Sequence, residues 1–143
     1  MQEVVELSPN LASALIAGAQ EEGREELMEL WARLLANAVD PRLNSVRRSF
    51  IEAVKAMDPP DAAVLAYLHS QGYMRVVGSG TDRETIGLDV LPLRLLTNRN
   101  SITVSLNHLV AIGLMGKTDS GIWHQNDYGQ EFMRACYPEL SAA

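Results

Sequence analysis

The sequence feature that most constrains the fold is an amphipathic segment at residues 25–41. Apolar side chains recur in it at steps of three and four, a spacing that places them on one side of an α-helix. Pro41 ends the helix, because proline has no amide hydrogen and disfavours helical geometry at the preceding residue. Trp31 lies in the middle of the stripe, so we expect it to anchor a buried core. The stripe consists of Leu27, Leu30, Trp31, Leu34, Leu35 and Ala38.

Helical spacing and turn residues recur along the rest of the chain. Ser8 and Pro9 are typical of a helix start, and Asn126 or Asp127 can cap the last helix. A stretch rich in glycine and polar residues, 78–85, reads as a mobile connection. The pattern predicts helices at 10–19, 46–57, 62–70, 88–96, 101–112 and 128–136, a short strand at 73–77 and a β-hairpin at 114–124.

This order predicts a mostly α fold. Three helices followed by a hairpin are the pattern of a winged helix, with residues 102–112 in the place of the recognition helix and residues 117–121 at the tip of the wing. We therefore expect an N-terminal helical bundle, residues 1–58, packed on a winged-helix-like region, residues 59–143. A chain of 143 residues suits one compact unit built from these two parts.

Charge and composition narrow the classes of partner. The formal net charge is −6, and residues 1–72 hold eleven acidic against six basic residues. Neither half has the basic surface that phosphate neutralisation requires, so nucleic acid is disfavoured as a partner. The longest small or apolar run, residues 11–19, is too short to cross a membrane. A single cysteine, Cys136, excludes an intrachain disulfide, and we expect a cytoplasmic protein.

A DNA-binding winged helix remains the alternative interpretation. In that geometry side chains near the start of the recognition helix meet base edges, and asparagine or serine can read bases. The base-reading candidates are Ser101, Thr103, Ser105, Asn107 and His108, and the candidates for holding phosphates are Arg94, Arg99 and Lys117.

The sequence offers few groups for catalysis. His69, His108 and His124 have no metal-ligand spacing to one another or to Cys136, and we expect neither a metal nor another cofactor. Sequence motifs of hydrolases, P-loop proteins and zinc peptidases are absent. We therefore expect no enzymatic activity. An enzyme would need a pocket that joins two or more of His69, His124, Arg47 and Arg48.

A protein partner is the preferred hypothesis. The polar side of the 25–41 helix carries Glu25, Glu26, Glu29 and Arg33, and Arg47–Arg48 is the only adjacent basic pair in the chain. Both sets are ordinary solvated surface unless a partner covers them. The acidic helical half and the small-residue helix at 10–19 also suggest self-association into a homo-oligomer. The partner itself is not identified by these residues.

Two separated segments together resemble the Abi-alpha (abortive infection alpha) family of bacterial proteins. The specific segment, residues 30–41, reads Leu-Trp-Ala-x-Leu-Leu-Ala-Asn-Ala-x-Asp-Pro, and Ser-Phe-Ile-Glu at 49–52 and Asp-Pro-Pro-Asp-Ala at 58–62 follow it. The second segment comprises residues 104–114 and 127–136. Relatives often have Leu-Thr-x-x-Gly before the last helix, where this chain has Gln-Asn-Asp-Tyr-Gly at 125–129.

The resemblance implies a role in phage defence through abortive infection, and it implies no catalytic residues. Longer members have a further N-terminal region, so we expect this chain to be a short member or a fragment. The leading hypothesis is a non-enzymatic protein-interaction module of this family. The DNA-binding regulator is the alternative.

Overall fold

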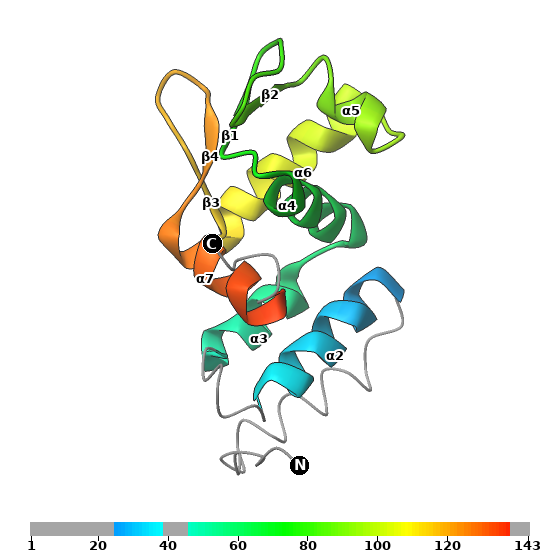
Figure 1. The fold of residues 1–143 in the computed structure, drawn as a ribbon, viewed down its shortest axis with the longest axis vertical. Helices are drawn as coiled ribbons and strands as arrows, with labels where there is room; N and C mark the ends of the chain where they lie inside the picture. Colours follow the sequence, from blue (N-terminus) through cyan, green and yellow to red (C-terminus); the bar gives the residue numbers. More distant parts are fainter. Residues whose placement is uncertain (1–24, 39–45, 138–143) are drawn as a thin grey trace. The chain divides into compact units, whose positions relative to one another are not determined.

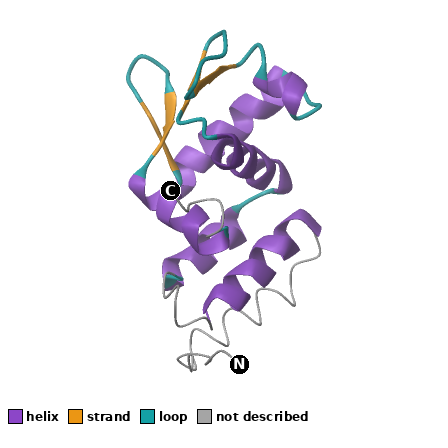
Figure 2. Ribbon diagram, viewed as in Figure 1, coloured by secondary structure: helices purple, strands orange, loops and turns teal. Residues whose placement is uncertain are grey.

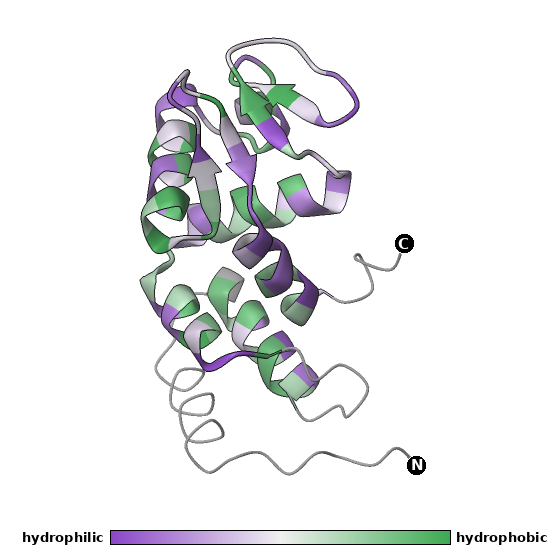
Figure 3. Ribbon diagram, turned by 90° about the vertical axis from the view of Figure 1, so that its left-hand side faces the viewer, coloured by the Kyte–Doolittle hydropathy of each residue, from purple (hydrophilic) through white to green (hydrophobic). Residues whose placement is uncertain are grey.

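The computed structural model describes residues 25–38 and 46–137 (Figure 1). Helices predominate and one small sheet accompanies them (Figure 2), which confirms the expectation of a mostly α chain. The helix predicted at residues 10–19 lies outside the described residues. Along the described helices, hydrophobic and hydrophilic residues alternate in short bands (Figure 3), as the apolar stripes in the sequence predict.

The chain divides into two compact units. One unit comprises residues 1–56 and 131–143, and the other comprises residues 57–130. We call them the outer unit and the central unit, after their positions in the sequence. Helix α7, Asp127–Cys136, begins in the central unit and ends in the outer unit.

The described core of the outer unit forms where three apolar helix faces meet. Helices α2, Glu25–Ala38, and α3, Arg48–Ala56, pack together with the last part of α7. Trp31 is 1% exposed, which confirms it as a core anchor. Phe50 of α3 meets Phe132 of α7 edge to face, with ring centroids 5.4 Å apart. Aromatic pairs favour this arrangement, which helps to fix α7 against α3.

The helices of the central unit begin and end at residues suited to those positions. Helix α4, Pro59–Gln71, packs on α6, Arg99–Ile112, and the short α5, Leu91–Arg94, precedes α6. Asn98 caps α6 by accepting a hydrogen bond from the Ser101 amide at 2.8 Å. Gly113 ends α6 with φ 95°, a conformation that favours glycine. The core includes Val64, Leu65, Leu68, Val76, Ile86, Ile102, Leu106 and Leu109.

A four-stranded mixed sheet completes the central unit. Its strands are β1, Arg75–Val77, β2, Thr85–Gly87, β3, Met115–Lys117, and β4, Trp123–Gln125, in the order β2-β1-β4-β3. The predicted hairpin is confirmed, because β3 and β4 pair antiparallel with Gly116 opposite His124. Strand β1 pairs antiparallel with β4 and parallel with β2.

The sequence-based boundaries around β2 were wrong. The end of the stretch read as a mobile connection belongs to β2, and the helix predicted at 88–96 is reduced to α5. The loop from β1 to β2 folds back because the Gly80 amide donates to Asp89 Oδ1 at 3.0 Å. Gly87 permits this close approach, since a Cβ there would collide with the Ser79 backbone. These contacts join residues nine and eight positions apart, so they have no periodic signature.

The start of α7 depends on Asn126 and Gly129. Asn126 Oδ1 accepts the Gly129 amide at 2.7 Å, which identifies Asn126 as the capping side chain. Asn126 Nδ2 also donates to the Gly113 carbonyl at 3.1 Å. Gly129 lies against the Leu114 carbonyl so closely that no Cβ would fit.

None of the described helices has the length and apolar character needed to cross a membrane.

Candidate functional site

The candidate base-reading side chains of α6 are largely engaged within the central unit. Asn107 Oδ1 accepts a hydrogen bond from Trp123 Nε1 at 3.1 Å. Thr103 Oγ1 donates to the Arg99 carbonyl of its own helix at 3.0 Å. Ser105, expected to face outward, is 2% exposed because the buried face of α6 extends around it. Ser101 is half-buried at the first turn of α6. Of these residues, Ser105 is buried, while Thr103 and Asn107 make hydrogen bonds within the unit and Asn107 remains exposed.

The three candidate phosphate-holding cations are exposed but differ in their surroundings. Arg94 donates from Nη1 to the Tyr67 hydroxyl at 2.9 Å. Lys117 Nζ, at the end of β3, lies 4.5 Å from the centre of the ring of Trp123 in β4, which is a cation–π contact. Arg99 is the first residue of α6. Two of the three thus contact aromatic residues of the central unit.

His108 contacts a buried carboxylate, a pairing that the sequence did not predict. Its Nδ1 hydrogen bonds to Asp61 Oδ2, and Asp61 is 2% exposed. The same Oδ2 accepts the Asp58 amide at 2.9 Å, so Asp61 also closes the first turn of α4. His108 therefore links α6 to the beginning of α4. The only sequence signal was an acidic residue three positions after the helix cap.

Among the described residues, one group of side chains has ligand atoms close enough to hold a metal ion, and it includes Asp61 and His108. Oxygens of Asp58 and Asp61 and a nitrogen of His108 lie within 4.8 Å of one another. Two carboxylates and an imidazole suit a divalent cation. However, Asp61 already accepts hydrogen bonds from both neighbours, and the start of α4 contributes positive partial charge. We therefore attribute the set to the fold.

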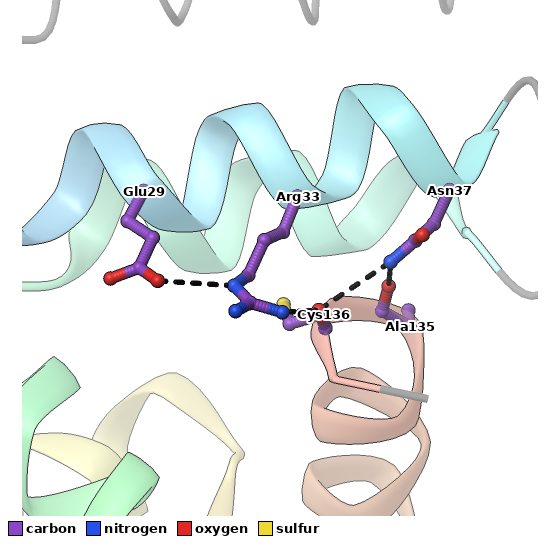
Figure 4. Close-up of polar contacts among 5 residues, drawn as sticks. All are labelled: Glu29, Arg33, Asn37, Ala135 and Cys136. Carbon is purple, nitrogen blue, oxygen red and sulfur yellow. Dashed lines mark hydrogen bonds and ion pairs between the residues drawn. The ribbon is translucent and has the colours of Figure 1, made fainter. Parts of the chain in front are cut away.

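The polar side of α2 is partly occupied by the end of α7. Arg33 pairs with Glu29 at 3.2 Å, and its guanidinium lies 4.3 Å from the centre of the Tyr137 ring. Figure 4 shows Arg33 and Asn37 directed at the last carbonyls of α7. Arg33 Nη1 donates to the Cys136 carbonyl at 3.5 Å, and Asn37 Nδ2 donates to the Ala135 carbonyl. These two side chains satisfy carbonyls that a helix end leaves without intrahelical partners.

The other residues predicted to contact a partner are either exposed or have side chains that the structure does not describe. Glu29 is exposed, and so are Arg47 and Arg48 at the start of α3. Glu25 and Glu26 belong to α2, but their side chains lie outside the described part of the chain. The structure does not gather Glu29, Arg47 and Arg48 into a described cluster.

Cys136 and the remaining histidines, His69 and His124, are the other groups with reactive side-chain chemistry. Cys136 is fully buried, and burial raises the pKa of its thiol well above the ordinary value, so the thiol stays protonated. Partial burial lowers the pKa of His69 from its ordinary value. The His124 ring lies across Gly116 on the neighbouring strand, where a Cβ would collide with it.

Three apolar side chains of the central unit are exposed, which the sequence does not predict. Leu93, Leu96 and Val104 of the central unit are 73%, 93% and 68% exposed. The sequence predicts a helix at 88–96 that includes both leucines. Only the short length of α5 and the backbone conformation of Leu96 reveal that they lie at the surface.

Comparison with protein families gives one match, and it covers nearly the whole chain. The profile of the family described as "Abortive infection alpha" matches residues 1–136 of 143. The chain belongs to the abortive infection alpha family. Neither curated proteins nor solved structures give a match.

Within this abortive infection alpha protein, the structure connects the two segments that carry the family resemblance. Asn37 belongs to the Leu-Trp-Ala-x-Leu-Leu-Ala-Asn segment, and the carbonyls that it contacts belong to Ala135 and Cys136 of the second segment. Trp31 and Leu34 of the first segment are core residues. The family pattern in the outer unit is thus explained by packing and helix capping.

Proposed function

We propose that this protein is a non-enzymatic protein-interaction module that acts in phage defence by abortive infection. Membership of the abortive infection alpha family supports the biological setting. The observation that carries the mode of action is the engagement of the polar α6 side chains. Asn107, Thr103 and His108 hydrogen bond to Trp123, Arg99 and Asp61. These hydrogen bonds occupy one polar atom of each side chain, which makes the three residues weaker candidates for reading DNA bases.

We also propose that the central unit is a winged helix. Its elements follow the order α4, β1, α5, α6, β3 and β4, and β2 adds an edge strand. The β3–β4 hairpin takes the place of the wing, and β1 pairs with β4 beside it. A winged helix can bind protein as well as DNA, so the fold does not identify the partner. The partner class has to be inferred from the residues exposed on its surface.

The surface of α6 favours protein over DNA. Its exposed residues include Asn100, Val104, Asn107 and Ala111, at spacings that place them on one face. Beyond Arg99, α6 contains neither lysine nor arginine. An uncharged face with Val104 near its middle lacks the phosphate contacts that dominate DNA affinity. The net charge of −6 opposes DNA binding further.

The absence of catalysis is part of the proposal, and the states of the candidate groups support it. The Cys136 thiol is buried and protonated, which removes the only cysteine as a nucleophile. His108 contacts Asp61 through Nδ1, and Asp61 also accepts the Asp58 amide. These groups contribute to packing and to a helix start.

Capture of partners from infected cells tests the function. We expect the tagged full chain to reduce phage yield and to retain specific proteins from infected bacteria, while duplex DNA at low salt shows no binding by fluorescence anisotropy. Binding to DNA that falls steeply with salt and is lost in Arg99→Ala or Lys117→Ala, but kept in Arg83→Ala, would favour the regulator instead. Arg83 is a suitable control because it is also an exposed arginine of the central unit.

A further inference from the structure

The turn between α5 and α6 holds a leucine in a conformation that leucine rarely adopts. Leu96 has φ 54°, and it is the only described residue other than glycine with positive φ. The Leu96 amide donates to the Leu93 carbonyl at 3.4 Å, and the Thr97 amide donates to the Pro92 carbonyl at 2.9 Å. These two bonds form a Schellman motif with Leu96 at the position that glycine usually occupies. Glycine would adopt this conformation with less strain.

The side chain of Leu96 gains no burial within the fold that would offset the backbone strain. It is 93% exposed, and Leu93, whose carbonyl accepts the Leu96 amide, is 73% exposed. A strained backbone that presents apolar side chains to water is typical of a functional position. Contact with a partner would remove both leucines from water.

The charges around the two leucines indicate the chemistry of that partner. Arg94 follows Leu93 in α5, Arg99 begins α6, and both are exposed. Residues 91–101 contain no acidic residue. We call Leu93, Arg94, Leu96 and Arg99 the turn patch. It is apolar and basic, although the chain as a whole carries a net charge of −6.

Helix α2 presents the complementary combination. Met28 is 46% exposed, and it is the only large apolar side chain so exposed among the described residues of the outer unit. Glu29 and Ala32 are also exposed, and residues 28, 29 and 32 lie close together on one side of a helix. We call these three residues the α2 patch. It is apolar and carries one carboxylate, that of Glu29, which also pairs with Arg33 of the same helix.

We propose that the α2 patch of one copy docks on the turn patch of a second copy, so that the protein forms a homodimer. The proposal rests on the proposed function and names its first partner. Met28 covers Leu93 and Leu96, and Glu29 meets Arg94 and Arg99. Because every copy carries both patches, each copy can take part in the contact through either patch. Complementary charge orients the approach and makes association weaker at high salt.

Sedimentation equilibrium of the full 143-residue chain tests the proposal. We expect a concentration-dependent dimer that weakens as salt rises. Leu96→Gly should raise the dissociation constant about tenfold or more, because it removes an apolar contact from the interface. The same substitution should leave the melting temperature equal or higher, since glycine relieves the turn. A residue with a purely structural role would not weaken the dimer while keeping or raising the melting temperature.

Charge reversal provides a matched test. Arg99→Glu and Glu29→Lys should each abolish the homodimer, because each places like charges together at the contact. An equimolar mixture of the two variants should recover the dimer, since a contact between the two variants then pairs opposite charges. Arg83→Glu, a charge reversal at an exposed arginine outside the patches, should have no effect.

Two results would overturn the dimer. A strictly monomeric wild-type chain at high concentration removes it, and the proposed function is then judged separately by capture of other proteins from infected cells. A wild-type dimer that survives Leu96→Gly and Met28→Ser places the interface elsewhere. Failure of the mixed charge variants to associate, with both chains folded, rejects the pairing of the two patches.

Discussion

Gly129 shows how a single residue can reverse an expectation from helix propensity. It lies in the first turn of α7, where alanine would ordinarily be favoured by up to about 1 kcal/mol. A methyl group at this position would collide with the Leu114 carbonyl. We therefore expect Gly129→Ala to reduce the free energy of unfolding by about 1–3 kcal/mol, as overpacking usually does. Urea denaturation measures the change.

Gly78 offers the control for this prediction. A Cβ at Gly78 would meet no atom within 4 Å, and its φ is not in the left-handed region. Gly78→Ala should change the free energy of unfolding by less than about 0.5 kcal/mol, the usual range for a surface substitution. Equal effects at the two glycines would show that the Leu114 contact is unimportant.

Two substitutions of Trp31 distinguish how its volume and its polar Nε1 atom each affect the free energy of unfolding. The residue is 1% exposed, and its Nε1 has no hydrogen-bond partner among the described residues. We expect Trp31→Ala to cost about 3–5 kcal/mol through the cavity that it creates. Trp31→Phe should cost much less, because it keeps an aromatic ring and removes an unsatisfied buried donor. An unchanged melting temperature in Trp31→Ala would place this residue at a binding surface.

At the scale of elements, Asn37 is the clearest link between distant parts of the sequence. Its amide donates to the Ala135 carbonyl and, at 3.4 Å, to the Cys136 carbonyl, so α2 caps the C-terminal end of α7. Asn37→Ala should cost about 1–2 kcal/mol, because it leaves helix-end carbonyls without a protein donor. Hydrogen exchange should accelerate at the last amides of α7. Glu52→Gln, which alters only an exposed ion pair within α3, should leave that exchange unchanged.

Elements governed by helical periodicity could be predicted from the sequence. The α2 stripe with Trp31, the hairpin around Gly121 and the cap at Asn126 were all expected and are present. Strand β2 and the His108–Asp61 pair were missed, since they depend on contacts between segments that share no periodic pattern. The exposure of the turn-patch leucines was not predicted, because exposure of an apolar residue leaves no mark in a local sequence.

The surface assignments show the same limit. The outward direction of Ser105 followed from helical spacing, but the buried face of α6 proved wider than the apolar stripe. Arg33 was placed correctly on the polar side of α2, yet its guanidinium contacts the end of α7. Sequence spacing gives the side of a helix on which a residue lies. It does not say which later segment will cover that side.

At the scale of the whole molecule, α7 is the element that both units share. Its first residues belong to the central unit, and residues 131–136 belong to the outer unit. Separate unfolding of either unit would interrupt a continuous helix and leave backbone groups without partners at the break. We therefore expect the two units to unfold in one cooperative transition.

The two tryptophans make this expectation testable, because Trp31 lies in the outer unit and Trp123 in the central unit. Trp123→Phe leaves Trp31 as the sole indole reporter, and Trp31→Phe leaves Trp123. In each background the urea midpoint followed by fluorescence should coincide with the midpoint followed by circular dichroism. Gly129→Ala, a change in the central unit, should lower the Trp31 midpoint as much as the Trp123 midpoint. If it moves only the Trp123 signal, α7 does not transmit stability and the units unfold independently.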